Sequence, residues 1–318
     1  MDHDKTVGRK GKGVLYVFSA GNGRVRGDNC AADGYLNRID TIAIACVRAD
    51  GEPPLYSEAC NAVMATAYSG GNTDPIKIIT TDIFGTCTCE HTGTSAASPF
   101  VAGVLALALE ANPGLTWRDA QHLLAWSCDV APVSHSAGWE RNARKLWYHP
   151  AYGFGLINAF KLVSLAKGWT NVPPQAKCEI PVDVGTVTDF SKASSWKQSV
   201  NVTACSGTAD EVKFQDCRSS NTSTRIDFNV VPVYQELNIT GRGVNIIVLD
   251  DGIDYGHEDL AASFSPDLSY NFNNDTNDCR PRSSDSRNKH GTRCAGQLVM
   301  KPNNSKCGVG ICYGAKVG

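Results

Sequence analysis

Three short apolar runs constrain the fold more than any other feature of this sequence. They are residues 13–20 (GVLYVFSA), 41–47 (TIAIACV) and 243–249 (GVNIIVL). Glycine or polar residues bound each run, and none shows the strict polar alternation of a strand with one face in water. Such near-continuous runs are typical of strands buried on both faces of a parallel sheet. With helical patterns between them, they predict an α/β fold.

Polar side chains follow two of these runs directly. Asn22 follows the first run, and Asp250 and Asp251 follow the third. Since ligands bind at the carboxyl ends of parallel strands, we expect the strands ending at Asn22 and Asp250 to share one sheet. Taken alone, Asn22 beside glycine is a common turn residue, and Asp250 is equally a metal ligand or turn former.

A run of small residues, HTGTSAASP at positions 91–99, leads into an apolar helix predicted at Val101–Glu110. Ser95 at this junction is either an ordinary helix N-cap or a nucleophile beside the positive end of a helix. His290 heads a second helix start of small residues, HGTRCAG. Ser95, His290 and Asp250 together supply the components of a Ser/His/Asp catalytic site.

The remaining chain suggests further helices and a change of character after residue 168. Thr116 with Asp119 is typical of a capping box that opens a helix, and another helix is predicted at Gly155–Lys167. Residues 169–214 are polar with short β-prone pieces, which favours the start of a separate β domain. We therefore divide the chain into residues 11–168, 169–214, a polar junction at 215–225, and 226–318.

Charge and cysteine content limit the possible functions. The net charge of −2 offers no footprint for nucleic acid or an anionic membrane. No apolar run approaches membrane-spanning length, and the first residues are charged where a secretory signal would be apolar, so this chain encodes neither a membrane anchor nor a signal peptide. However, 13 cysteines and five N-glycosylation sequons favour a glycoprotein of an oxidising compartment.

Four stretches resemble the subtilisin-like proprotein convertases of the kexin/furin type, within peptidase family S8. They are VLDDGID at 248–254, HGTRCAG at 290–296, SAGNG at 19–23 and HTGTSA at 91–96. The resemblance covers most of residues 11–205 and 227–318. It implies a subtilisin-like three-layer α/β fold, a parallel sheet flanked by helices, followed by the start of a β-rich P domain.

The resemblance assigns catalytic roles residue by residue. It implies Ser95 as the nucleophile, His290 as the general base, Asp250 as the group that orients the imidazole, and Asn22 as the oxyanion donor. It further implies cleavage of protein or prohormone substrates after paired basic residues. The segment that contains Asp33 and Tyr35, together with Asp251, matches the subsites for those basic side chains.

The resemblance also implies bound Ca²⁺, three disulfides and a location in the secretory pathway. Carboxylate and carbonyl oxygens are the ligands that calcium prefers. One implied site comprises Asp259 and Asn304 with the carbonyls of Lys301, Lys306 and Gly308; the other contains Asp28 and Glu58. The implied disulfides are Cys30–Cys60, Cys87–Cys307 and Cys178–Cys205, and Cys294 beside the general base is implied to be a free thiol.

The order of the motifs departs from the family. Convertases run Asp, His, Asn, Ser, whereas here Asn22 and Ser95 precede Asp250 and His290. The pattern is circularly permuted, and the family segment expected between Gly318 and Gly11 carries an edge strand that holds substrate. We therefore expect weak protease activity at most.

Two alternatives belong to other functional classes. A non-catalytic convertase-like fragment would bind partners without cleaving them. The chain order Ser95, Asp250, His290 is that of α/β-hydrolases, and GTSAA at 93–97 is one residue from their G-x-S-x-G turn. That turn needs a strand directly before the serine, and residues 87–91 are expected to be too polar to form one.

Overall fold

The computed structural model describes residues 2–70, 78–175, 228–281 and 287–318. The chain forms two units, one of residues 1–171 and 215–318 and the other of residues 172–214. The expected P-domain start lies almost entirely outside the described residues, and the expected junction at 215–225 lies wholly outside them.

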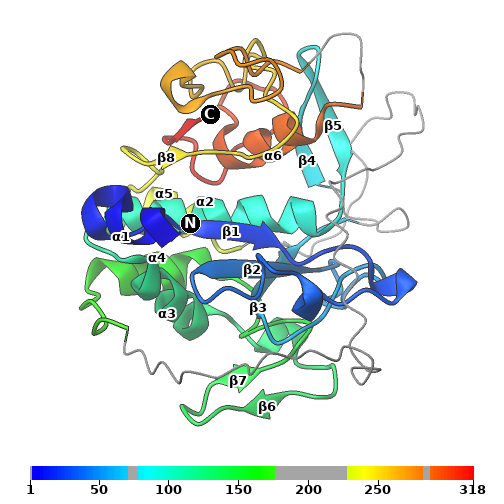
Figure 1. The fold of residues 1–318 in the computed structure, drawn as a ribbon, viewed down its shortest axis with the longest axis vertical. Coiled ribbons are helices and arrows are strands. Elements are labelled where there is room, and N and C mark those ends of the chain that lie inside the picture. Colours follow the sequence, from blue (N-terminus) through cyan, green and yellow to red (C-terminus); the bar gives the residue numbers. More distant parts are fainter. Residues whose placement is uncertain (1, 71–77, 176–227, 282–286) are drawn as a thin grey trace, which may run out of the picture. The chain divides into compact units, whose positions relative to one another are not determined.

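Apart from 3-10 turns, the described part of the first unit begins with a helix and five consecutive strands, and pairs of helices and short strands follow (Figure 1). In chain order they are α1 (Asp2–Gly11), β1 (Tyr16–Ser19), β2 (Thr41–Val47), β3 (Val63–Tyr68), β4 (Ile78–Asp82), β5 (Thr86–His91), α2 (Thr94–Ala111), α3 (Trp117–Ser127), β6 (Glu140–Arg141), β7 (Trp147–Tyr148), α4 (Ala159–Lys167), α5 (Val231–Gln235), β8 (Asn245–Ile246), α6 (His290–Val299) and β9 (Lys316–Val317).

The first two apolar runs form strands of a parallel sheet, which confirms the predicted α/β class. The sheet has the order β1-β2-β3, with Val17 opposite Ile42 and Ile44 opposite Ala65. Every residue of β2 is buried, as the uninterrupted run predicts. β1 occupies only the last part of its run.

The third apolar run differs from its prediction. Within it only β8 is a strand, and β8 pairs in parallel with β9 in a sheet separate from β1-β2-β3. The expectation that the strands ending at Asn22 and Asp250 share one sheet is therefore wrong. Because β8 has a single neighbouring strand among the described residues, the end of the run is open to solvent, and Ile247 and Leu249 are 58% and 78% exposed.

Helix α2 lies at the centre of this unit. It packs against β1 and β2, against α4, and against α6 (Figure 1). Its predominantly apolar composition fits a helix that is buried on most sides. By length and composition α2 could span a membrane, contrary to the expectation that no apolar run approaches that length, but 61% of it is buried within the fold, as in the core helix of a globular protein.

Of two helix starts predicted from local sequence signals, that of α3 is confirmed and that of α4 is wrong. Thr116 caps α3 with Asp119 in a reciprocal capping box, as expected. Helix α4 begins at Ala159, capped by Asn158, and not at Gly155. Gly155 has φ +125°, and a Cβ there would lie 2.6 Å from the Asp129 carbonyl oxygen, so this residue is part of a close turn and cannot open a helix.

The segment before Ser95 also corrects an expectation. Residues 87–91 lie in β5, although their polarity suggested that they form no strand. β5 pairs antiparallel with β4 around a turn in which Phe84 and Gly85 both have positive φ. Most of β5 is only partly buried, so polar residues are tolerated there.

Candidate active site

The described structure brings Asp250 and His290 together at the start of α6. Asp250 Oδ2 lies 2.6 Å from His290 Nδ1. The backbone N–H groups of His290 and Gly291 donate to the two carboxylate oxygens of Asp251, at 3.0 and 2.7 Å. Asp251 therefore satisfies the N-terminus of α6, where free N–H groups favour a negative charge, and this fixes the backbone of His290.

The charges around this pair shift its ionisation. Burial of the imidazole lowers the pKa of His290, but its hydrogen bond to Asp250 and its contact with Cys294 outweigh burial, so the net pKa is raised. Burial and the charge of Asp250 raise the pKa of Asp251, and the N–H groups of Gly291 and His290 oppose that shift. The carboxylate of Asp250 thus favours the imidazolium form of His290, the form that a general base adopts after taking a proton.

Ser95 lies in the first turn of α2, beside the face of α6 that carries His290. Its carbonyl oxygen is 3.7 Å from Cys294 Sγ, one helical turn beyond His290. Within the described residues no hydrogen bond joins the Ser95 hydroxyl to His290. Catalytic hydrogen bonds of this kind often shorten only when substrate binds.

Asn22 lies against the turn that precedes Ser95. Its Oδ1 accepts hydrogen bonds from the backbone N–H and the hydroxyl of Thr94, at 2.9 and 3.0 Å. A Cβ on Gly93 would lie 3.1 Å from Asn22 Nδ2, and Gly93 has φ +88°, so glycine is needed there. The Asn22 amide N–H groups are consequently held beside the turn that leads to Ser95.

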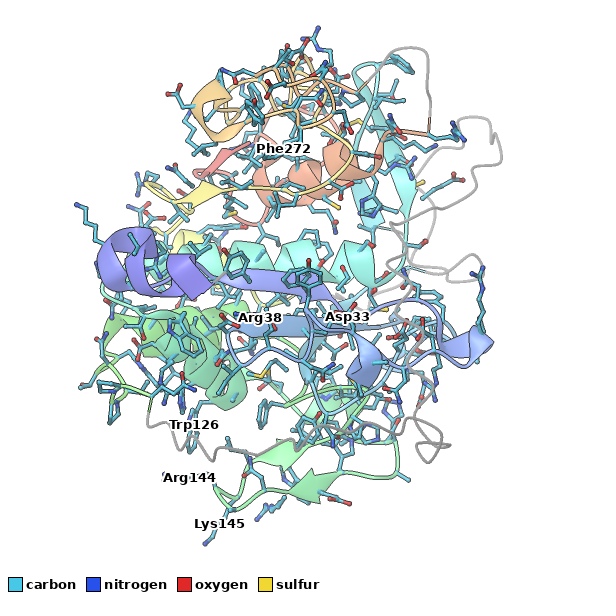
Figure 2. All side chains as sticks on the ribbon, viewed as in Figure 1. Asp33, Arg38, Trp126, Arg144, Lys145 and Phe272 are labelled. Carbon is cyan, nitrogen blue, oxygen red and sulfur yellow. A yellow bond between two sulfur atoms is a disulfide. The ribbon has the colours of Figure 1, made fainter. Side chains whose placement is uncertain are left out.

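The residues predicted to bind substrate differ in their surroundings. Asp33 lies in an exposed loop after β1, where its carboxylate accepts from the backbone N–H groups of Tyr35 and Leu36 (Figure 2). The Tyr35 ring stacks on Phe18 with ring centroids 6.0 Å apart. Both oxygens of Asp251 are bonded to α6, so its role toward substrate stays a prediction.

The first set of expected calcium ligands lies together. Asp259 is 1% exposed, the Asn304 amide donates to its Oδ1, and its Oδ2 is buried without a hydrogen-bond partner in the described structure. Lys306 N–H donates to Asn304 Oδ1 at 3.2 Å. Lys301 N–H donates to the Asp259 backbone carbonyl at 3.2 Å, and the roles of the Lys301, Lys306 and Gly308 carbonyls stay a prediction.

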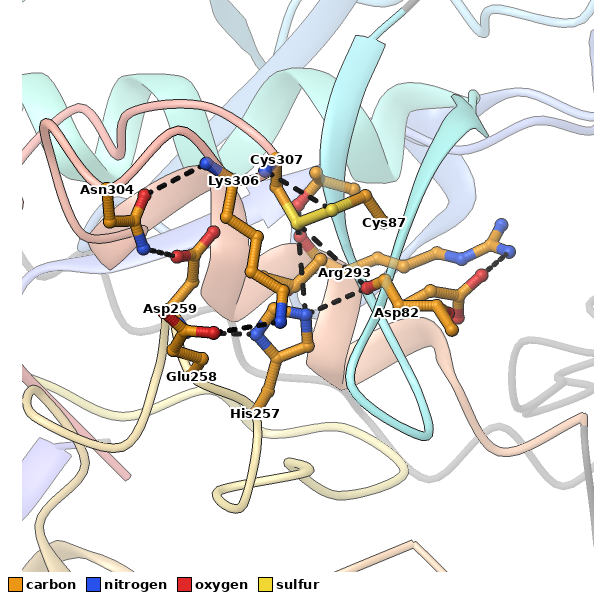
Figure 3. Close-up of a disulfide and its surroundings, with 12 residues drawn as sticks. Asp82, Cys87, His257, Glu258, Asp259, Arg293, Asn304, Lys306 and Cys307 are labelled. Atoms are coloured by element: carbon orange, nitrogen blue, oxygen red, sulfur yellow. Dashed lines mark hydrogen bonds and ion pairs between the residues drawn. A yellow bond between two sulfur atoms is a disulfide. The ribbon is translucent and has the colours of Figure 1, made fainter. Parts of the chain in front are cut away.

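A buried histidine joins the backbone of Asp259 to a disulfide (Figure 3). His257 Nε2 lies 2.8 Å from the Thr86 carbonyl oxygen, and the Asp259 backbone N–H donates to its Nδ1 at 3.0 Å. Cys87, which follows Thr86, forms a disulfide with Cys307. The Asp259 backbone and the 301–308 loop are therefore tied to the same strand, β5.

The second set of expected calcium ligands also converges. Glu58 Oε1 accepts from Gly23 N–H at 2.8 Å, and a Cβ on Gly23 would lie 2.6 Å from the Asp28 side chain. Burial, together with the negative charges of Asp28 and Asp33, raises the pKa of Glu58. A cation between Asp28 and Glu58 would offset this repulsion.

The cysteine pairing agrees with the resemblance wherever the structure describes it. Cys30–Cys60 and Cys87–Cys307 are disulfides, as implied. Cys294 is a buried free thiol, also as implied. Cys178 and Cys205 lie outside the described residues.

A sequence profile of the subtilase family, Peptidase_S8, matches residues 2–155 and 241–318. These ranges contain Asn22, Ser95, Asp250 and His290 and exceed half of the chain. The chain belongs to the subtilase family. Membership of this family supports the subtilisin-like fold, the kexin/furin-type resemblance and the chemistry of a serine-type endopeptidase.

Curated relatives of this subtilase are convertases. It is 41% identical to furin of Homo sapiens over 210 residues, covering 64% of this chain and 25% of furin. It is 42% identical to furin-like protease 2 of Drosophila melanogaster over 66% of this chain and 13% of that protein, and 44% identical to endoprotease bli-4 of Caenorhabditis elegans over 54% and 18%. The chain thus spans a quarter or less of the length of these relatives.

A solved structure gives the same assignment of fold. The crystal structure of the serine protease of Aeromonas sobria aligns with this subtilase at a TM-score of 0.50 and 25% identity. The alignment covers 54% of this chain and 40% of that chain. The α/β subtilisin-like class therefore agrees with both comparisons.

The sequence placed Cys294 beside His290, but it did not predict the contacts of this thiol, of Gln297 or of His91. Cys294 and Gln297 of α6 contact the first turn of α2, and His91 packs edge-on against His290 with ring centroids 5.5 Å apart. Burial, with the nearby charges of His290 and Arg293, lowers the pKa of His91 well below its usual value. The available signal was the helical spacing of Cys294 and Gln297 from His290, four and seven residues, which places all three on one face.

Proposed function

We propose that this subtilase has the site of a calcium-dependent serine endopeptidase that cleaves proteins or prohormones after paired basic residues, and that its cleavage of extended peptides is weak at most. The observation that carries the proposal is the 2.6 Å Asp250–His290 hydrogen bond at the helix that packs against the turn of Ser95. A base held in one orientation beside a serine at a helix N-terminus is the arrangement that activates a hydroxyl.

In the proposed reaction Ser95 Oγ attacks the carbonyl carbon of the peptide while His290 takes the hydroxyl proton. Asp250 holds the proton on His290 Nδ1, which leaves Nε2 as the base, and stabilises the imidazolium that forms. The carbonyl oxygen becomes an oxyanion that accepts a hydrogen bond from Asn22 Nδ2. His290 then returns the proton to the leaving amine, and water releases the acyl group from Ser95 by the same steps in reverse order.

Acidic side chains support the preference for basic substrates. Asp33 is exposed next to the Asn22 end of β1, and Asp251 adjoins the catalytic aspartate. Lysine or arginine side chains of a substrate would gain charge-assisted hydrogen bonds there. Asp251 would have to share its carboxylate with the N-terminus of α6.

Calcium fits the donor sets found in the described residues. The buried, unpartnered Oδ2 of Asp259 and the neighbouring Asn304 oxygen suit a hard cation, as do Asp28 and Glu58. When bound, calcium would supply positive charge that neutralises these carboxylates and ties their loops together. The carbonyls of Lys301, Lys306 and Gly308 would complete the first set.

The two observed disulfides support a secretory location. Disulfides persist in oxidising compartments and are rare in the cytosol. We propose that the protein acts in the Golgi lumen, in vesicles or outside the cell.

A small active-site reagent tests the proposed chemistry directly. A fluorophosphonate needs an activated serine but no extended substrate, so it should label Ser95, with the adduct located by peptide mass spectrometry. Ser95→Ala and His290→Ala should abolish labelling, whereas Ser98→Ala, on the same helix, should retain it. Labelling that persists in Ser95→Ala would refute the assignment of the nucleophile.

A non-catalytic binding protein is the second candidate, and the sheet topology favours it. β8 and β1 each have one paired neighbour among the described strands and lie in separate sheets. Each strand therefore has a free edge, but the two edges belong to different sheets and do not form one continuous edge for a substrate. Specific binding of a basic peptide together with an unreactive Ser95 would favour this function over catalysis.

A further inference from the structure

Three side chains on one face of α6 point toward the same region. His290, Cys294 and Gln297 are spaced by four and three residues, which aligns them along a helix. Cys294 and Gln297 are 5% and 1% exposed. The face that presents the general base thus continues into two buried polar side chains.

Both side chains donate to the backbone of the turn that carries the nucleophile. Gln297 Nε2 donates to the Ala96 carbonyl at 2.8 Å. Cys294 Sγ lies 3.7 Å from the Ser95 carbonyl, within the range for a hydrogen bond from sulfur. These contacts join residues about 200 positions apart in the chain.

A proline explains why the Ser95 carbonyl needs a partner outside its helix. In an α-helix the carbonyl of residue i accepts from the N–H of residue i+4, and position i+4 from Ser95 is Pro99, which has no N–H. A buried carbonyl without a partner is costly, so the Cys294 thiol fills a position that the sequence leaves open. His91 closes the group from β5, with its Nε2 3.8 Å from Cys294 Sγ.

The hydrogen bonding of the Gln297 amide indicates that this residue serves to hold the Ala96 carbonyl in place. Its Oε1 is buried and has no hydrogen-bond partner in the described structure, so the residue bears the cost of an unpaired polar atom. An apolar side chain of similar size would avoid that cost. What only Gln297 provides is the N–H that holds the Ala96 carbonyl.

We propose that Cys294 and Gln297 are positioning residues that fix Ser95 relative to His290 through the carbonyls of Ser95 and Ala96. The inference rests on the proposed function, because it concerns the geometry of that triad. Rotation or sliding of α6 against α2 would change the separation of base and nucleophile, and these two hydrogen bonds oppose such movement. Small misplacements of reacting groups cost up to about 100-fold in rate.

The test uses fluorophosphonate labelling of the full chain, with kinact and KI measured separately. In this reaction Ser95 Oγ forms a bond to phosphorus, fluoride leaves, and the hydroxyl proton passes to His290. The variants are Gln297→Met, which removes the donor at similar volume, and Cys294→Ala. Gln121→Met is the matched control. Gln121 on α3 also donates to backbone carbonyls, but to those of Ile39 and Thr41, which are not part of the triad.

We expect Gln297→Met to lower kinact by roughly 10- to 100-fold with KI unchanged, and Cys294→Ala to lower it by a smaller factor. Gln121→Met should leave kinact unchanged even if it lowers the melting temperature. A folded Gln297→Met chain whose kinact stays within twofold of the parent would overturn the inference; if that variant does not fold, a Cys294→Ala chain with unchanged kinact does the same. A parent chain that is not labelled at all overturns the proposed function, and the inference with it.

Discussion

The imidazole of His290 can act as a base only while it is neutral. Asp250 and Cys294 raise its pKa, so the rate of Ser95 labelling should rise with pH to a midpoint above about 6.5, the usual histidine value. Asp250→Asn should shift this midpoint to lower pH and reduce the plateau. Because the pKa of His290 is raised to about 11, labelling rates measured from pH 5 to 12 give both the midpoint and the plateau. Asp50→Asn, the same charge change in an exposed pair with Arg48, should leave the profile unchanged.

The same shift has a consequence for stability, with a defined sign. A histidine whose folded pKa is raised stabilises the fold below its unfolded pKa, and this contribution is lost as pH rises through the folded value. The Asp250–His290 pair should therefore stabilise the fold most at mildly acidic pH. If the pH midpoint of Ser95 labelling were the same in Asp250→Asn as in the parent, the role given to Asp250 would be contradicted.

At this scale the sequence predicted the residues that lie within a motif. Asn22, Asp250 and His290 were found because each follows a strand or heads a helix in a recognisable pattern. The hydrogen bond from Gln297 to Ala96 was not predictable, because its two ends belong to different motifs and no local pattern joins them. The hydrogen bonds of Asp251 to the start of α6 were missed for the same reason.

Single elements depend on buried polar groups at their ends. Asp119 in α3 is fully buried and accepts from Thr116 N–H, Thr116 Oγ1, Trp169 Nε1 and Asn171 Nδ2, at 2.6 to 3.1 Å. Asp119→Ala should lower the free energy of unfolding by about 2–4 kcal/mol, because it removes a cap and leaves buried donors unpaired. Urea unfolding checks this value. Asp50→Ala should change it little, and an equal loss in both variants would refute the argument.

The 301–308 loop should respond to calcium. Binding to the native state alone stabilises it by RT ln(1 + [L]/Kd), about 2.7 kcal/mol at 100 times Kd, so millimolar calcium should raise the melting temperature. Asp259→Ala should reduce the calcium-induced shift, and combination with Glu58→Ala should remove it. Without calcium, Asp259→Ala should cost little, because it also removes an unpartnered buried oxygen.

Asp267→Ala serves as the control for the calcium experiment, since this residue lies outside both ligand sets. Its calcium-induced shift should equal that of the parent. An undiminished shift in the Asp259→Ala/Glu58→Ala chain, or no shift in the parent, would contradict both sites.

Elements were predictable where the sequence pattern matched their surroundings. Thr41–Val47 is uninterrupted in sequence and is fully buried in the sheet, and the Thr116–Asp119 pair formed the expected capping box. The start of α4 was missed because a contact with Asp129 fixes Gly155. β5 was missed because an edge hairpin needs no apolar run.

At the scale of the whole molecule, the described strands that lead to Asn22 and to Asp250 lie in two different sheets, and this limits what the chain can do to a long substrate. Extended peptides are positioned by pairing with a strand edge, and the described strands that end near Asn22 and Asp250 belong to different sheets. The end of the 243–249 run, which leads to Asp250, is exposed to solvent. Chemistry at Ser95 and cleavage of a peptide are therefore separable in this chain.

We expect slow or undetectable cleavage of an Arg-X-Lys-Arg fluorogenic peptide in calcium, even where a fluorophosphonate labels Ser95. The small reagent needs only the serine, the base and the oxyanion donor, whereas peptide cleavage also needs near-attack geometry along an extended chain, and its loss costs on the order of 100-fold or more.

Joining Gly318 to Gly11 through the corresponding segment of a furin relative should restore cleavage, and a scrambled segment of equal length should not. The ratio of kcat/KM for the peptide to the rate of fluorophosphonate labelling separates peptide positioning from chemistry at Ser95. Only kcat/KM for the peptide should rise when the segment is restored. Efficient, Ser95-dependent cleavage by the unmodified chain would show that the two sheets already position the substrate.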